Sequence, residues 1–151
     1  VAGAWIESVP LIIISGQCKR SDMLRDSPLR QKGVQEVDIV KMVKSITKFS
    51  IIVENPEDIR SIMEQAYHIA KDGRAGPVWI DVPLDIQNMR IEPDQLEQFV
   101  VNEEITFFEP LSDDIQYVKE LYQKAKRPVV LIGSGIYSSD AINELELFIK
   151  K

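Results

Sequence analysis

Apolar-rich runs of strand length alternate with amphipathic segments over the first half of the chain. The runs are residues 11–15, 46–53 and 78–82, and the first and third are bounded by glycine or proline. Strands that are apolar on both faces are typical of a parallel sheet, in which helices cover both sides. The pattern therefore predicts three buried strands.

Apolar positions recur at helical spacing between these runs. They predict a first helix closed by Pro10, a short helix over 34–43, and a longer helix that begins at Asn55-Pro56 and ends at Gly73. Asparagine is a good capping residue, proline suits the first helical position, and glycine often ends a helix. Alternating strands and helices predict an α/β fold, a parallel sheet with helices on both faces.

The periodicity disappears over residues 87–111, where acidic residues greatly outnumber the single base Arg90. This segment is predicted to be an interdomain linker. A helical pattern resumes at Ser112, which is predicted to cap it, and stops before Pro128. Residues 129–132 are then predicted to form a buried strand, and a glycine turn leads into a last helix with an apolar stripe at 142, 145, 148 and 149.

The two ends of the chain lack the usual helix boundaries. Val1 opens within a helical pattern with no capping residue before it, and the last helix reaches Lys150-Lys151 with no glycine, asparagine or proline to end it. We expect the 151 residues to be an internal piece of a longer polypeptide. The alternative is a small natural protein with ragged ends.

Composition narrows the class of protein. Hydrophobic residues make up 44% and charged residues 28% of the chain, as in ordinary folded domains. The net charge of -6 argues against nucleic acid and anionic membranes as partners. No apolar run approaches the roughly 20 residues that span a bilayer. One cysteine and one histidine leave no internal disulfide and argue against a transition-metal site, so we expect a reducing, cytoplasmic location.

Few residues suggest chemistry by themselves. Gly133-Ser134-Gly135 is predicted to lie between a strand and a helix, where backbone N–H groups can bind a nucleotide, but Ser138 replaces the third glycine of the dinucleotide motif. A structural tight turn is the alternative. Glu36 and Asp38 could act as an acid–base pair or simply favour a helix start.

The remaining candidates are single residues or scattered charges. The segment 18–33 is a long basic loop that could bind an anionic substrate or simply be solvated; its bases are Lys19, Arg20, Arg25, Arg30 and Lys32. Cys18 has no histidine nearby in sequence to activate it. His68 lies within a predicted helix and is expected to serve packing or the surface.

Four segments together resemble one enzyme family. They are Ala2-Gly3-Ala4-Trp5-Ile6-Glu7-Ser8-Val9-Pro10 running into Ile13-Ile14-Ser15-Gly16-Gln17, then Val34-Gln35-Glu36-Val37-Asp38, Ser45-Ile46-Thr47-Lys48, and Asp72-Gly73-Arg74-Ala75-Gly76-Pro77-Val78-Trp79-Ile80-Asp81-Val82-Pro83. Their order and spacing resemble thiamine diphosphate-dependent enzymes of the acetolactate synthase type. The resemblance continues through Lys126-Arg127-Pro128-Val129-Val130.

The resemblance implies a domain organisation. Residues 1–86 would be the second half of a pyrimidine-binding domain, 87–111 a linker, and 112–151 the start of a Rossmann-like central domain. The family's activating glutamate and its ligands for Mg²⁺ and diphosphate would lie outside these residues. The chain alone is therefore expected to be inactive, with no catalytic residue or metal ligand of its own.

The resemblance also implies individual roles. Gln35 would line the substrate pocket, Lys48 would lie near the substrate entrance, and Gly133, Ser134 and Gly135 would contact FAD. Two positions depart from the family pattern: Val34 replaces a phenylalanine, and Leu84 replaces a lysine at the substrate entrance. The basic loop is also longer than in biosynthetic acetolactate synthases, so the acceptor is left open.

The leading hypothesis is a carboligase that uses thiamine diphosphate and Mg²⁺ on pyruvate or a similar 2-oxo acid, as a homodimer or homotetramer. A decarboxylase or C–C hydrolase on the same scaffold is one alternative. A nucleotide-binding regulatory module built on the glycine turn is the other.

Overall fold

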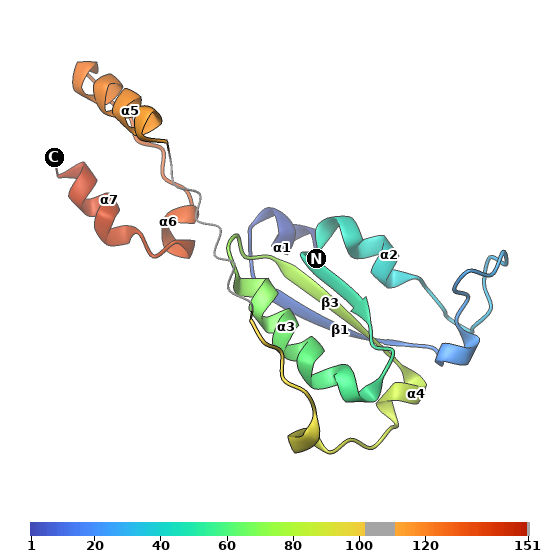
Figure 1. The fold of residues 1–151 in the computed structure, drawn as a ribbon. Coiled ribbons are helices and arrows are strands. Elements are labelled where there is room, and N and C mark those ends of the chain that lie inside the picture. Colours follow the sequence, from blue (N-terminus) through green and yellow to red (C-terminus); the bar gives the residue numbers. More distant parts are fainter. Residues whose placement is uncertain (102–110, 151) are drawn as a thin grey trace. The chain divides into compact units, whose positions relative to one another are not determined.

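The computed structural model describes residues 1–101 and 111–150, and the chain divides into two units, Val1–Val101 and Asn102–Lys151. The first unit contains the sheet and most of the core (Figure 1). Its elements in chain order are α1 (Ala2–Ile6), β1 (Leu11–Gln17), α2 (Ile39–Val43), β2 (Phe49–Ile52), α3 (Ile59–Lys71), β3 (Pro77–Pro83) and α4 (Leu84–Gln87).

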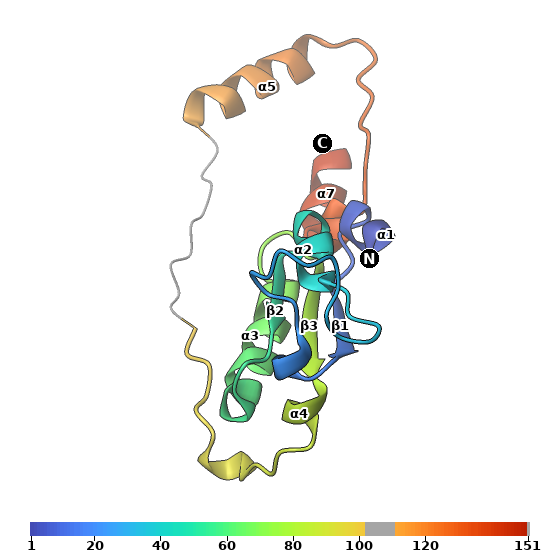
Figure 2. The same cartoon turned by 90° about the vertical axis from the view of Figure 1, so that its right-hand side faces the viewer.

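The three strands form a parallel sheet in the order β1-β3-β2. In both views α2 and α3 lie on opposite sides of this sheet (Figure 1, Figure 2). The predicted α/β class is therefore confirmed. Because the strands are parallel, all three carboxyl ends meet at one edge of the sheet, where such folds bind ligands.

The core lies between the sheet and α3. Val78 and Ile80 of β3 are fully buried, and α3 contributes Ile62, Ala66 and Ala70 at helical spacing. These three residues recur at intervals of four, so they occupy one face of the helix. Central strand β3 is buried almost throughout, as its apolar sequence predicts.

Local contacts shorten two predicted elements. Residues 44–46 form a 3-10 turn, and the Thr47 hydroxyl donates to the Val43 carbonyl (2.9 Å), so β2 begins at Phe49 rather than at 46. The helix predicted over 34–43 begins only at Ile39, because Asp38 caps it by accepting from the Lys41 N–H (3.1 Å).

The predicted cap of the long helix is wrong in detail. The Asn55 amide donates to the Asp58 carboxylate (3.1 Å) and makes no capping bond to a backbone N–H. A 3-10 turn at Pro56–Asp58 precedes α3 instead. Proline and two acidic residues still mark the helix start, because both suit the first turn.

The predicted linker is partly structured. Its first residue lies in α4, a 3-10 turn follows at Pro93–Gln95, and the Phe99 N–H donates to the Glu64 carboxylate on α3 (2.8 Å). Residues up to 101 therefore belong to the first unit. The part of the predicted linker at 102–110 lies outside the described residues.

The described part of the second unit is helical. It contains α5 (Ser112–Lys124), α6 (Gly135–Ser138) and α7 (Ile142–Ile149). Ser112 is the first residue of α5 and makes no capping hydrogen bond, so its predicted capping role is wrong. The apolar stripe of α7 meets α5 through Phe148, whose ring lies 5.2 Å from that of Tyr122.

The buried strand predicted at 129–132 is wrong for the chain as described. Val129 is 92% and Leu131 98% exposed, and these residues pair with no strand in the described ranges. A buried strand requires neighbours that satisfy its backbone groups and cover its side chains. Within residues 1–101 and 111–150, no helix is long and apolar enough to cross a membrane.

Candidate functional site

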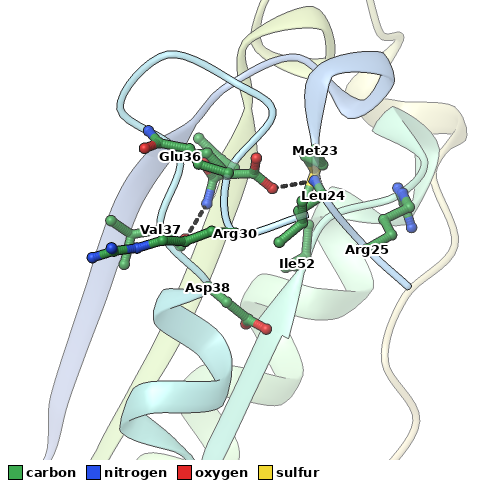
Figure 3. A pocket seen from close by; sticks show the side chains of 10 residues that line it. Met23, Leu24, Arg25, Arg30, Glu36, Val37, Asp38 and Ile52 are labelled. Carbon is green, nitrogen blue, oxygen red and sulfur yellow. Dashed lines mark hydrogen bonds between the residues drawn. The ribbon is translucent and has the colours of Figure 1, made fainter. Parts of the chain in front are cut away.

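A cavity of about 210 Å³ opens at the carboxyl edge of the sheet (Figure 3). The ends of β1 and β2 form its floor, through Gln17 and Ile52, and the loop between β1 and α2 forms its walls. This is the edge at which parallel α/β sheets bind small molecules. The complete lining is Gln17, Met23, Leu24, Arg25, Arg30, Gln31, Glu36, Val37, Asp38 and Ile52.

A polar network leads from the interior of the sheet to this cavity. Asp81 on β3 is fully buried, and its carboxylate accepts from the Ser15 hydroxyl (2.6 Å) and from Gln17 Nε2 (2.9 Å). The Trp79 indole N–H donates to Ser15 Oγ (2.7 Å). These four residues share one face of the sheet because side chains alternate along each strand and Ser15 is paired with Asp81.

Arg20 joins the ends of all three strands. Its backbone N–H and Nε donate to the Asp85 carboxylate (3.0 and 2.6 Å), and Nη1 donates to the Glu54 carbonyl (2.6 Å). Arg20 follows β1, Glu54 follows β2 and Asp85 follows β3. The hydrogen bonds from the Arg20 backbone and side chain hold the pKa of Asp85 below its usual value.

The basic residues of the loop do not converge on one anion site. Arg20 and Arg25 form ion pairs with Asp85 and Glu54 (2.6 and 2.8 Å), so both charges are matched within the first unit. Figure 3 shows the Arg25 and Arg30 side chains extending in opposite directions. Arg20 and Arg25 are therefore not free to bind an anionic substrate, which weakens the hypothesis that the whole basic loop does so.

Glu36 and Asp38 have structural contacts. The Glu36 carboxylate accepts from the backbone N–H groups of Leu24 and Gly33, and these bonds lower the pKa of Glu36. Asp38 caps α2. An ionised carboxylate that accepts several hydrogen bonds is a poor general base, which argues against the acid–base pair. Asp38 fits the predicted helix start, whereas Glu36 binds backbone N–H groups of the loop and not of the helix.

The predicted substrate residues lie at two different edges of the sheet. Gln35 immediately precedes the lining residues Glu36 and Val37, and Leu84 follows the carboxyl end of β3 with 45% exposure. Lys48 lies at the amino edge, where its backbone N–H donates to the Pro77 carbonyl (2.8 Å). Neither Gln35 nor Leu84 lines the cavity itself, although the chain places both after the carboxyl end of a strand, whereas Lys48 precedes β2 at the opposite edge.

Lys48 is held by contacts at the amino edge of the sheet. Its ammonium donates to the Asp72 carbonyl, its stem packs against Gly76, and burial lowers its pKa. It lines a shallow depression of about 650 Å³ together with Trp5, Ile6, Asp72, Arg74 and Ala75.

Gly133, Ser134 and Gly135 lie in the second unit. They form the turn that opens α6, where the Ile136 N–H donates to the Gly133 carbonyl (3.3 Å). A Cβ atom added to either glycine would meet no atom within 4 Å. The described residues therefore form no cradle around this turn.

Cys18 and His68 behave as structural residues. Burial and the nearby Glu36 carboxylate raise the pKa of the Cys18 thiol, which disfavours the reactive thiolate. The His68 ring lies 5.9 Å from the ring of Phe99, in agreement with the predicted packing role.

Sequence reasoning missed the Asp81 network and the contacts of Arg20. One signal was present for the first: Asp81 is a charged residue inside a run predicted to be buried, and a buried carboxylate needs hydrogen-bond partners. No local signal identified Arg20, because Asp85 lies 65 positions away in sequence.

Comparisons with known proteins relate nearly the whole chain to larger enzymes. It is 33% identical to the acetolactate synthase large subunit of Corynebacterium glutamicum, over 98% of this chain and 23% of that protein. It is 32% identical to a glyoxylate carboligase of Escherichia coli O157:H7, over 96% of this chain and 23% of that protein. The chain thus spans about a quarter of the length of the curated relatives it matches.

A solved structure agrees with these relatives. The chain aligns with benzoylformate decarboxylase from Polynucleobacter necessarius with a TM-score of 0.68 and 28% identity, over 96% of this chain and 26% of that one. No protein-family model matches the chain.

Proposed function

We propose that this chain is part of a carboligase that acts on pyruvate or a similar 2-oxo acid. The proposal starts from the confirmed relationship of the chain to thiamine diphosphate-dependent enzymes of the acetolactate synthase type. The observation that carries this proposal is the identity of about a third with acetolactate synthase large subunits over nearly the whole chain. The matched length includes every segment that forms the carboxyl edge of the sheet.

Within such an enzyme, this chain would help to shape the substrate site. We propose Gln35 and Leu84 as substrate-binding residues, because Gln35 directly precedes two residues that line the cavity and Leu84 directly follows the carboxyl end of β3. Lys48 is retained as a proposed substrate residue from the family resemblance alone, because it lies at the opposite edge within one copy of the chain.

The proposed cofactors are thiamine diphosphate, Mg²⁺ and FAD. Thiamine diphosphate would stabilise the carbanion that forms when a 2-oxo acid loses carbon dioxide. By the family resemblance, the ligands for Mg²⁺ would lie outside these 151 residues. FAD at Gly133, Ser134 and Gly135 is proposed from the resemblance, and its pocket would need further residues around this open turn.

The assembly and location are proposals of the same kind. We infer a homodimer or homotetramer in the cytoplasm, with neither nucleic acid nor membrane as a partner. The net charge of -6 supports the proposal that neither nucleic acid nor an anionic membrane is a partner.

A decarboxylase is the second candidate function. The benzoylformate decarboxylase neighbour favours it, because that enzyme shares the fold at 28% identity. A carboligase adds the carbanion to a carbonyl acceptor, whereas a decarboxylase releases an aldehyde.

The experiment uses the complete protein that contains this chain, supplied with thiamine diphosphate and Mg²⁺. Pyruvate consumption, acetolactate and acetaldehyde are measured in parallel. We expect pyruvate loss that depends on thiamine diphosphate and yields acetolactate or another carboligation product when an aldehyde is added. Aldehyde release without carboligation would make the protein a decarboxylase. Flavin or ADP binding without thiamine diphosphate binding would favour the regulatory module.

A further inference from the structure

Asp81 is buried although it carries a carboxyl group. It lies on the central strand, it is fully shielded from solvent, and two side chains hydrogen-bond to it. A polar group in such a place usually costs stability compared with a well-packed apolar residue. We therefore expect the role of Asp81 to be the positioning of the residues to which it hydrogen-bonds.

Those hydrogen bonds lead to Gln17 and fix it completely. Nε2 of Gln17 donates once to Asp81 and once to the Val37 carbonyl (2.9 and 2.8 Å), while Oε1 accepts from the Cys18 N–H (3.0 Å). Both amide donors are thus in use, and the side chain has one available orientation. Gln17 links the interior of the sheet to the loop that borders the cavity.

The far end of this link is the segment that carries Gln35. Val37, the acceptor of Gln17, lies two residues after Gln35, whose φ of 61° places it in the left-handed region. A residue other than glycine keeps this conformation only where the surrounding contacts impose it. Gln17 donates to the Val37 carbonyl on one side of Gln35, and the adjacent Glu36 carboxylate accepts from the Leu24 and Gly33 N–H groups.

We propose that Asp81 is a positioning residue that, through Gln17, holds residues 35–37 in register with the carboxyl edge of the sheet and so sets the affinity for the substrate. Ser15 completes the arrangement, because its hydroxyl donates to Asp81 and accepts from the Trp79 indole. This inference rests on the proposed function, since it treats Gln35 as a substrate-binding residue.

The test compares Asp81→Asn with Thr47→Val in the complete protein. Asparagine keeps the shape of Asp81 but brings an N–H₂ group toward Ser15 or Gln17, each of which needs an acceptor. Thr47 is a matched control, because it is also buried and its one side-chain hydrogen bond is to the Val43 carbonyl. Steady-state kinetics with the 2-oxo acid and hydrogen exchange of residues 33–38 are measured for both variants.

We expect Asp81→Asn to raise KM about tenfold with kcat changed by less than about twofold, because binding and not chemistry depends on the segment. Exchange of residues 33–38 should become faster while exchange of α3 stays the same. Thr47→Val should change neither KM nor the exchange of this segment. An unchanged KM in Asp81→Asn, or equal effects of the two variants, would overturn the inference.

A second pair of variants covers the case in which Asp81→Asn does not fold. Ser15→Ala removes the hydroxyl that Asp81 and Trp79 share, whereas Ser15→Thr keeps it on a residue that suits a strand. We expect a raised KM and faster local exchange in Ser15→Ala and recovery of both in Ser15→Thr; equal behaviour of the two would refute the link. If the unmodified protein does not consume 2-oxo acids, the proposed function fails, and the exchange data still decide whether Asp81 holds residues 33–38.

Discussion

At the scale of single residues, the loop beside the cavity is held by carboxylates that accept backbone N–H groups. Glu36 bonds to Leu24 and Gly33, which lie on two different parts of the loop. A single side chain thus links two parts of the loop that are distant in sequence. The bonds require the ionised form of Glu36, so the conformation of the loop should depend on pH.

This dependence has a definite sign. The backbone hydrogen bonds lower the pKa of Glu36 in the folded protein, so the unfolded chain binds the proton more readily. The stabilisation is fully present above the unfolded pKa of about 4.3 and is lost as the pH falls through the folded value. We expect Glu36→Gln to lower the free energy of unfolding at pH 7 and to differ less from the unmodified protein at lower pH.

Urea unfolding between pH 3 and 7 checks this expectation. Glu97→Gln is the control, because Glu97 is exposed and lies on a different segment of the first unit. Parallel pH curves for Glu36→Gln and the unmodified protein would show that these hydrogen bonds contribute nothing to stability.

Residue roles could be predicted where the cause is local. The packing or surface role predicted for His68 follows from its place on an amphipathic helix, and its ring lies near that of Phe99. A helix-start role is one of two predictions for Asp38, although the predicted helix begins at 34 and the observed helix begins at Ile39. The partners of Glu36 and Asp81 depend on how the loop folds back and on which strands pair. Neither is visible in a short stretch of sequence.

At the scale of elements, Arg20 ties the carboxyl ends of β1, β2 and β3 together. The guanidinium reaches Asp85 with one nitrogen and the Glu54 carbonyl with another. Lysine has the same charge but a single nitrogen, so it cannot serve both positions with the same geometry. The arrangement therefore depends on the shape of arginine as much as on its charge.

We expect Arg20→Lys to lower the free energy of unfolding by about 1 kcal/mol, the size of one partly exposed hydrogen bond. Trypsin should also cleave faster within residues 24–33, because the loop loses its anchor to the sheet. Arg60→Lys is the control: Arg60 pairs with Glu64 on α3, donates to backbone carbonyls at 93 and 96 outside the loop, and has similar exposure. Equal cleavage rates in the two variants would mean that Arg20 does not restrain the loop.

Elements were predicted well where sequence signals and tertiary contacts agree. The helix after Pro56 and the strand before Pro83 are both found, because each has a bounded apolar pattern and a partner within the first unit. The strand predicted at 129–132 has the same apolar pattern but no partner among the described residues. An apolar run indicates that burial of the segment is favourable. Whether the segment becomes a strand depends on a neighbouring strand with which it can pair.

At the scale of the molecule, the parallel sheet separates the predicted substrate residues. Leu84 lies at the carboxyl edge with the cavity, and Lys48 lies at the amino edge. Strand β3 spans the seven residues between these edges, a length of roughly 20 Å. Within one copy of the chain, Lys48 therefore cannot replace the positive charge that the family resemblance implies at position 84.

This separation gives Leu84→Lys a clear expected effect in the complete protein. Leu84 is 45% exposed beside the end of β3, so a lysine there can reach solvent and approach a carboxylate at the cavity edge. An exposed charge pair at 4 Å contributes about 1 kcal/mol, and more where water is excluded. We expect kcat/KM for acetolactate formation from pyruvate alone to rise by up to about tenfold, which corresponds to about 1.4 kcal/mol.

Val100→Lys is the matched control, because it adds the same charge at an exposed residue next to Phe99, which is held against α3. A rise confined to Leu84→Lys would mean that the unmodified protein binds pyruvate weakly for lack of this charge, and that a different carbonyl compound is its better acceptor. A rise in both variants would reflect the net charge of the protein, since a less negative surface attracts any anion. High acetolactate formation by the unmodified protein, with Leu84→Lys neutral or harmful, would mean that position 84 does not set specificity here. In that case the cavity beside Gln17 would have to supply the contacts that bind pyruvate, and the effect of Asp81→Asn on KM would become the direct measure of them.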